Sequence, residues 1–406
     1  MERILLGQLG AKGDSLYATI LARQLRHDYP DAEITWAIFD QNADLLLNNP
    51  HIDAVWKVPQ GNAQDSILMW SVFEQEAVRR FVRREFDRVV LSQIHPNNFQ
   101  NYDGTVRPCI LRAYGAPITV PIENVIELTD GEIARVEAFA REAELDRFEH
   151  RVLFECSSRS GQSFMTPDLA QEVAARLYEK LPDLTVVFNT HLPMELKDKR
   201  SRYAGTLSLR EMAHLTRHCS VFVGAGSGGT VSATSTAARA LPMIQLLEKS
   251  TSVFGSFAHD FEYFDIKDRP ILEMTDEDPE HIAECVAAMC RGEVEAAFAR
   301  FNGRIEVTFD QYFRNINRML LRELRFVDAA RSLMITAHRY GWTSDLIDFG
   351  AKEIVPSLKL DPSWLFHSNR LVGEKLRAQI EEAKKHPATS PQQGLWRDEN
   401  AWERPA

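Results

Sequence analysis

The residues of this chain whose types and spacing could do chemistry begin at its N-terminus. Gly7, Gly10 and Gly13 follow the apolar run Ile4–Leu6, and Asp14 stands where apolar residues at helical spacing begin. A short apolar run that ends in glycines is typical of a buried strand, so a strand, a glycine loop and a helix follow one another. In open α/β sheets such a loop lies at the carboxyl edge, where ligands bind. Asp14 would then point into that crevice.

Spacing alone leaves two interpretations of Asp14 open. Together with Ser15 it stands where a helix N-cap is wanted, and a capping carboxylate would accept a backbone N–H at the start of the helix. Alternatively, its carboxylate acts as a general base on a substrate bound in the crevice.

A second glycine loop, Gly224 to Gly229, lies between the apolar run VFV and a segment rich in small residues. Its G-x-G-x-x-G spacing, with Glu248 at the end of the next expected strand, matches the dinucleotide fingerprint and would indicate an NAD-linked oxidoreductase. That fingerprint normally opens its domain, whereas this loop follows three earlier units. A diphosphate is the alternative ligand, because the N–H groups of Gly228, Gly229 and Thr230 at a helix N-terminus would attract an anion.

The order of motifs near the N-terminus resembles that of the heptosyltransferases, glycosyltransferase family 9. Residues 3–58 contain in turn a strand, an LGxxGD loop, a helix, YPDAxI, a second strand and NPxID before a third strand. In that family the aspartate of the GD pair is the catalytic base, so the resemblance implies this role for Asp14. It also implies an α/β fold of two Rossmann-like domains facing each other across a cleft (GT-B).

Residues 205–246 resemble the donor-site segment of the same family, which contains GxxSLxExxxL, a strand, DSGxxH, a helix and a short strand after proline. Ser227 and Gly228 match the serine and glycine of DSGxxH. Gly226 stands in place of its aspartate and Val231 in place of its histidine.

Two further donor contacts are implied by the resemblance. The family's lysine in the loop after the first strand of this domain is missing, and Arg159 lies nearby instead. Glu195 matches an acidic position that can bind the nucleotide ribose, and its alternative is an exposed glutamate at a helix start. The expected donor-binding residues are Arg159, Glu195, Ser227, Gly228, Gly229 and Thr230.

The loop HPNNFQNYDGTVRP begins with His95 at the carboxyl end of an expected strand, so it would face the same crevice as Asp14. Its alternative is a surface loop with a turn at Asp103 and Gly104. The expected acceptor-binding residues are Lys12, His95 and Arg107.

Composition limits the class of protein. The chain has 406 residues, 44% of them hydrophobic and 26% charged, which is typical of a soluble protein of two domains. It has no transmembrane-length apolar run and no signal peptide, so we expect a cytoplasmic protein, with peripheral contact at the inner face of the membrane as a further option. The net charge of −11 disfavours nucleic acid as the main partner. Scattered spacing favours reduced thiols for Cys109, Cys156, Cys219, Cys285 and Cys290.

Two successive strand–helix arrays predict the domain organisation. We expect an acceptor domain over 1–148, a nucleotide-sugar domain over 149–294, a helical extension over 295–383 and a loosely ordered tail over 384–406. Local signals predict helix caps at Thr166 and at Ser208 with Glu211. The acidic run Asp276 to Asp278 could form a metal-binding DxD, but its position before a helix favours capping.

The resemblance implies an inverting, metal-independent glycosyltransferase of the hexosyl or heptosyl type, acting in lipopolysaccharide or polysaccharide biosynthesis without a cofactor. The expected partners are a nucleotide-sugar donor and a saccharide or glycolipid acceptor. A non-catalytic GT-B binding or scaffold protein is the alternative, because the DSGxxH motif is broken. The NAD-dependent oxidoreductase is a third possibility.

Overall fold

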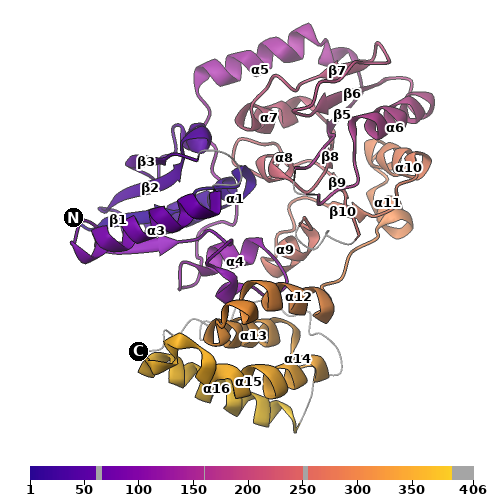
Figure 1. Cartoon of the computed structure of the whole chain (residues 1–406). Helices are drawn as coiled ribbons and strands as arrows, with labels where there is room; N and C mark the ends of the chain where they lie inside the picture. Colours follow the sequence, from indigo (N-terminus) through magenta and orange to yellow (C-terminus); the bar gives the residue numbers. More distant parts are fainter. Residues whose placement is uncertain (61–65, 160, 250–254, 386–406) are drawn as a thin grey trace.

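The computed structural model describes residues 1–60, 66–159, 161–249 and 255–385 (Figure 1). It contains two parallel sheets, which confirms the predicted α/β fold with two Rossmann-like units. The first sheet has the order β3-β2-β1-β4. Its strands are β1 (Arg3–Gly7), β2 (Glu33–Phe39), β3 (Ala54–Val58) and β4 (Arg88–Leu91).

Helices cover both faces of the first sheet. The amphipathic α3 packs on one face, where Trp70 and Phe73 are buried and Phe73 meets the ring of Trp56 edge-on at 5.3 Å. The buried residues of α2, among them Ile20, Leu21 and Leu25, share a core with Ile34 and Trp36 of β2. The helices of this part are α1 (Lys12–Tyr17), α2 (Thr19–Asp28), the 3₁₀ segment η1 (Asp40–Leu46), α3 (Ser66–Val82) and α4 (Arg107–Arg112).

The second sheet has six parallel strands in the order β10-β9-β8-β5-β6-β7. Its first strand in the chain, β5, lies inside the sheet between β8 and β6, so the strand order reverses beside β5. The strands are β5 (His150–Glu155), β6 (Leu184–Asn189), β7 (Ser201–Tyr203), β8 (Val221–Gly224), β9 (Met243–Leu246) and β10 (Ile271–Met274). The helices are α6 (Pro167–Lys180), α7 (Leu209–Leu215), α8 (Gly228–Ser232), α9 (Ala258–Tyr263), α10 (Pro279–Cys290) and α11 (Val294–Phe301).

The helix α5 (Asp130–Glu142) joins the two units, and it packs against α7 of the second one (Figure 1). Arg210 of α7 is buried and bonds to Glu132 of α5 as well as to the carbonyl oxygens of Leu45 and Leu47 in the first unit. By packing, α5 therefore belongs to the second unit, although it precedes the boundary expected at residue 148.

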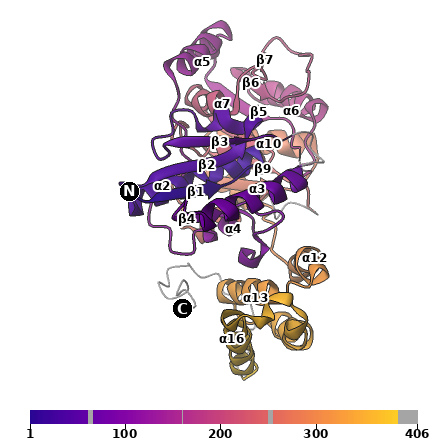
Figure 2. The ribbon, with the colours of Figure 1, turned by 60° about the vertical axis from the view of Figure 1, so that its left-hand side comes forward.

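The C-terminal part is helical over its described residues. Figure 2 shows α12, α13 and α16 grouped at one end of the molecule, beyond α4. The helices are α12 (Phe309–Met319), α13 (Phe326–Tyr340), α14 (Ser344–Phe349), α15 (Val355–Ser357) and α16 (His367–Ala383). The helix α11 packs on α10 and β10, so the separate helical part starts after it rather than at residue 295. Most of the predicted tail, 386–406, lies outside the described residues.

Local signals fixed the helix starts well. Thr166 caps α6, and Ser208 with Glu211 forms a capping box at α7. Asp278 accepts the N–H of Glu280, and Asp276 bonds to Asp278 N–H and His281, which agrees with capping. All five cysteines are free thiols.

The segment rich in small residues, 230–240, is helical only at its start, because α8 ends at Ser232. Hydroxyl groups in this segment bond to backbone carbonyls instead: Ser232 Oγ to Leu209 O, Thr234 Oγ1 to Val231 O and Thr236 Oγ1 to Ile126 O. Such bonds compete with helix formation.

Candidate active site between the two sheets

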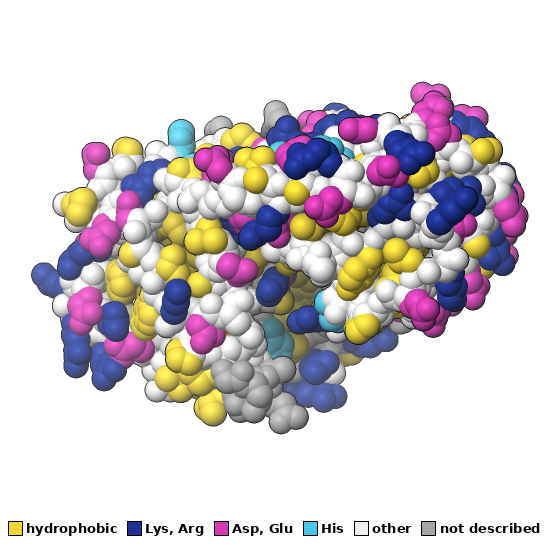
Figure 3. All heavy atoms as spheres, turned by 90° about the horizontal axis from the view of Figure 1, so that it is seen from above, with side chains coloured by type: hydrophobic (Ala, Val, Ile, Leu, Met, Phe, Trp, Pro, Cys, Tyr) yellow, Lys and Arg dark blue, Asp and Glu magenta, His cyan; other side chains and the backbone are white. Residues whose placement is uncertain are grey.

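The glycine loops of the two sheets meet face to face. Each loop follows a strand, β1 or β8, that lies where the strand order of its sheet reverses, which is where open α/β sheets bind ligands. A Cβ built on Gly13 would lie 3.3 Å from Gly228 Cα, so the two backbones are in contact. Seen from above, the surface is hollowed between the two units, and Lys, Arg and His side chains line the hollow (Figure 3).

Asp14 lies in the first turn of α1, half-buried beside this contact. The helix begins at Lys12 after Ala11, so Asp14 is not its N-cap, and no side chain caps this helix. Burial raises the pKa of the Asp14 carboxyl to about 6, while the charge of Arg107 and the backbone N–H of Ala11 act in the opposite direction. A carboxyl group with this pKa is half-ionised close to neutral pH and can accept a proton.

Arg107 joins the two units rather than standing open to a substrate. It is buried, and its guanidinium bonds to Ser256 O at 2.9 Å and to the buried Asp260 carboxylate of α9. The same group stacks over the Phe257 ring at 3.4 Å from its centroid. The expectation that Arg107 binds the acceptor directly is therefore wrong for this arrangement, and its influence on Asp14 is electrostatic.

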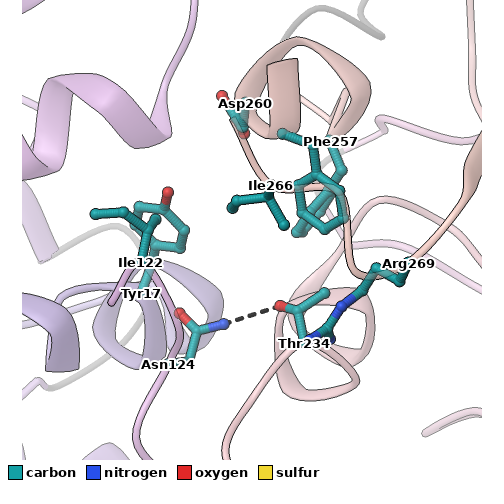
Figure 4. Close-up of a pocket in the computed structure, with 9 residues that line it drawn as sticks. Tyr17, Ile122, Asn124, Thr234, Phe257, Asp260, Ile266 and Arg269 are labelled. Carbon is teal, nitrogen blue, oxygen red and sulfur yellow. Dashed lines mark hydrogen bonds between the residues drawn. The ribbon is translucent and has the colours of Figure 1, made fainter. Parts of the chain in front are cut away.

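A small cavity lies next to this ion pair, between the first unit and α9 (Figure 4). Tyr17 and Asn124 line it from one side, and Thr234, Phe257 and Asp260 line it from the other. Asn124 Nδ2 donates to Thr234 Oγ1 across it at 2.9 Å. Its volume of about 20 Å³ admits a water molecule but no sugar.

The second glycine loop holds a carboxylate of the protein itself. Glu155, at the carboxyl end of β5, accepts from Gly229 N–H (2.9 Å), Ala225 N–H (2.8 Å), Thr230 Oγ1 (2.8 Å) and Ser227 Oγ. A Cβ on Gly229 would lie 2.2 Å from Glu155 Oε1, so a larger residue there would displace this carboxylate. The expectation that Ser227, Gly229 and Thr230 offer these groups to a diphosphate is therefore corrected.

Three other expected site residues lie at the surface. Lys12 is exposed at the first position of α1. Arg159 is exposed after β5, and its charge lowers the pKa of His191 together with partial burial of that ring. Glu195 is exposed in the loop between β6 and β7, and no helix starts there.

His95 belongs to a loop that the C-terminal helices cover. Arg325 donates to Pro96 O, Asn315 Nδ2 donates to Tyr102 Oη at 3.1 Å, and the Tyr102 and Tyr312 rings stack at 6.1 Å. Partial burial and the charge of Arg318 lower the pKa of His95. The loop therefore does not open onto the crevice as a whole, and the alternative of a free surface loop is also wrong.

The sequence-based interpretation missed two acidic residues. Glu155 could have been found from the sequence, because an ionisable residue ends the buried apolar run VLF of a strand. The role of Asp260 could not have been found from the sequence, because its partner Arg107 is 153 positions away.

Comparisons with known proteins concern the fold. No family model and no curated protein matches the sequence. A glycosyl transferase family 9 structure from Veillonella parvula is 17% identical, with a TM-score of 0.49 over 79% of this chain and 97% of that one. The ADP-heptose lps heptosyltransferase II of E. coli is 16% identical (TM-score 0.47, 72% and 99%), and an E. coli heptosyltransferase with ADP is 12% identical (0.44, 73% and 99%). These structures include the family that the sequence motifs resemble.

Among the described residues, no helix combines the length and the hydropathy needed to cross a bilayer.

Proposed function

We propose that this protein transfers a sugar from a nucleotide-sugar donor to a hydroxyl group, with Asp14 as the general base. The observation that carries the proposal is the Asp14 carboxyl itself. Asp14 follows β1 at the edge where open α/β sheets bind ligands, its neighbour Gly13 contacts the glycine loop of the second sheet, and burial raises the pKa of its carboxyl to about 6. The GD motif that supplies it is the one by which the sequence resembles heptosyltransferases.

In the proposed reaction the Asp14 carboxylate accepts the proton of the acceptor hydroxyl. The acceptor oxygen then forms a bond to the anomeric carbon, the bond from that carbon to the phosphate oxygen breaks, and the nucleoside diphosphate leaves with the electron pair. Attack opposite to the leaving group inverts the anomeric configuration. A positioned base contributes about 10²- to 10⁴-fold to such a step. The resemblance, not the structure, is the basis for metal independence.

The donor diphosphate requires hydrogen-bond donors or positive charges that are not already bonded to Glu155. The N–H of Gly228 has no hydrogen-bond partner among the described residues, and the Arg159 guanidinium is exposed beside the same sheet edge. We propose that these two groups, with Glu195 at the ribose, bind the donor, and that Lys12 and His95 lie toward the acceptor.

A glycolipid acceptor would bring the protein to a membrane surface. The solvent face of α3 carries Ile67, Leu68, Val72, Val78 and Val82, each more than half exposed, while Arg79 and Arg80 of its last turn pair with Glu76. An exposed apolar helix face suits a bilayer surface. Co-sedimentation with anionic vesicles tests this peripheral location, and equal recovery of wild type and Val78→Glu/Val82→Glu protein would contradict it.

A non-catalytic binding protein of the same fold is the second candidate. Glu155 favours it, because a carboxylate already holds three of the groups that a phosphate would use. The position of the loop disfavours an NAD-linked oxidoreductase, because it follows the fourth strand of its unit, β8, whereas the dinucleotide fingerprint normally opens the domain.

A thermal-shift screen of nucleotide sugars, nucleoside diphosphates, NAD and NADH separates these candidates. A ligand at 100 times its Kd adds about 2.7 kcal/mol to the free energy of unfolding. We expect a nucleotide sugar or nucleoside diphosphate to raise the melting temperature and NAD and NADH to leave it unchanged. Saturable NADH binding without any response to a nucleotide sugar would overturn the proposed function.

Measurements of turnover then test whether Asp14 acts as the general base. We expect Asp14→Asn to reduce kcat by at least about a hundredfold with nearly unchanged donor affinity. The wild-type rate should fall as pH drops through about 6, because the base becomes protonated. Asp31→Asn, an exposed carboxylate near the end of α2, is the matched control. Asp14→Asn turnover within a few-fold of wild type would remove Asp14 from the chemistry, and donor binding without turnover in the wild type would favour the binding protein.

A further inference from the structure

Three side chains with metal-ligating atoms meet where α5 packs on α7. His214 Nε2 lies 3.1 Å and His218 Nε2 lies 3.0 Å from the same oxygen, Oε1 of Glu137. All three ligating atoms lie within 4.8 Å of one another. The two histidines are largely buried, with side-chain exposures of 13% and 19%, whereas Glu137 is 42% exposed.

The local fold explains this convergence. His214 lies in the last turn of α7, and His218 ends the 3₁₀ segment η5 (Thr216–His218) that continues it, so the spacing of four residues puts both rings on one face. Glu137 projects from the facing helix α5. The pairs Arg135–Glu211 and Arg210–Glu132 also hold these two helices against each other.

We propose that Glu137, His214 and His218 bind a divalent transition-metal ion, with Zn²⁺ as the best-suited ion. Zn–N bonds of about 2.0–2.1 Å and Zn–O bonds of about 2.0–2.2 Å place tetrahedral ligand atoms roughly 3.3 Å apart, close to the two N–O separations of 3.1 and 3.0 Å. Two imidazoles and one carboxylate match the preference of zinc, whereas Mg²⁺ prefers oxygen ligands and retained water. The exposed side of Glu137 leaves the remaining coordination position to water.

The bound ion would fasten α5 to α7. This matters for the cleft, because Leu209 at the other end of α7 touches the second glycine loop: a Cβ on Gly228 would lie 3.3 Å from Leu209 Cδ1. Arg210 of the same helix reaches the first unit. The site therefore acts on the position of α7, and it is independent of the proposed sugar transfer.

Direct hydrogen bonds are the alternative account of this cluster. Each imidazole Nε2–H would donate to the Glu137 carboxylate, and the three groups would form a polar contact without an ion. The two accounts differ in the required state of the rings, because a metal ligand is a deprotonated nitrogen.

The experiment uses the full-length chain without an affinity tag, dialysed against a chelator and titrated with Zn²⁺ alone. We expect one Zn²⁺ per chain by calorimetry and a higher melting temperature, with no such effect of Mg²⁺. His218→Ala and Glu137→Gln should weaken Zn²⁺ binding by at least about a hundredfold, since loss of a mere outer-shell partner costs about 10- to 100-fold. His281→Ala, which removes an exposed histidine paired with Asp276, is the control and should bind as the wild type does.

Crystals of the wild-type protein soaked in Zn²⁺ test the site without the need for any variant. An anomalous peak between the two Nε2 atoms and Glu137 is the expected result. Absence of saturable Zn²⁺ binding, a peak elsewhere, or undiminished binding by His218→Ala would overturn the site and leave the hydrogen-bonded contact.

Discussion

The charged form of the Asp14 carboxyl destabilises the folded protein, which raises the pKa of this group. A raised pKa is the property that a general base requires. The Asp14 carboxyl lies in surroundings that favour the neutral state, with only Arg107 and the Ala11 N–H in opposition. The residue type and the loop were readable from the GD motif, because both are local. The raised pKa was not readable, since the burial that causes it comes from the second unit, whose loop contacts Gly13.

The stability of Asp14→Asn should depend on pH in a defined direction. The folded protein retains the proton of Asp14 up to a pKa of about 6, whereas the unfolded chain releases it near 3.8. Between these values the folded state binds more protons, so wild-type stability falls as pH rises through the window and stays lower above it. The asparagine variant escapes this loss, which amounts to about 3 kcal/mol at most.

We therefore expect Asp14→Asn to melt several degrees above wild type at pH 7.5 and level with it at pH 4, as measured by circular dichroism. Asp31→Asn controls for the removal of a charge. A variant that is less stable than wild type at pH 7.5 would mean that the Asp14 carboxylate is stabilised, as a helix cap would be.

We expect the second glycine loop to depend on Glu155 for its stability. Glu155→Gln replaces one carboxylate oxygen by an NH₂ group, so two of the four donors around it lose their acceptor. At about 1.5–3 kcal/mol for each hydrogen bond to a charged group, we expect a loss of about 3 kcal/mol or more. Thermal unfolding measures it, with the exposed Glu149→Gln as control. Equal melting temperatures would mean that Glu155 leaves the loop in solution.

At the scale of elements, local sequence patterns predicted the strands and the helix caps. They did not predict which helices pack over which loops and strands. Apolar runs and capping residues act over a few positions, so β1, β5 and the start of α7 were readable. The covering of the loop at His95 by α12 and α13 depends on contacts such as Tyr102 with Ser332, 230 positions apart, for which a single sequence holds no signal.

A buried cluster around Asp103 connects the helical part to both units. Asp103 accepts from Arg112 at 2.6 Å and from Arg339 of α13 at 2.9 Å, and these arginines hold its pKa below the usual range against burial. Arg339 also donates to His259 O of α9. This cluster therefore joins the first unit, the second unit and the C-terminal helices.

Arg339→Met should remove the contacts of Arg339 to Asp103 and to His259 O at once. Asp103 would keep Arg112, so we expect a loss of at least about 2 kcal/mol rather than the larger cost of an unpaired buried charge. The matched control is Arg322→Met, which removes an exposed charge from the same helical part. Limited proteolysis should cut Arg339→Met faster near the α12 start than the control, and equal rates would show that the helical part is held elsewhere.

At the scale of the whole molecule, buried ion pairs connect parts that the sequence presents as separate domains. Two strand–helix arrays predicted two parallel sheets, and the structure contains them. Their close contact could not be predicted, because the Arg107–Asp260 pair and the bond from Arg210 to Leu45 O join residues 153 and 165 positions apart.

These connections predict one cooperative unfolding transition in calorimetry. Separation of the two units would part Arg107 from Asp260 and leave a buried charge without its partner. Separation of the C-terminal helices would part Arg339 from Asp103 in the same way. Breaking a buried pair costs about 3–5 kcal/mol, which opposes independent melting. Arg107→Met should divide the wild-type transition into two or broaden it, whereas Arg135→Met, whose side chain is mostly exposed, should leave it single. Two transitions in the wild-type protein would contradict this coupling and indicate that the two sheets move freely before any donor binds.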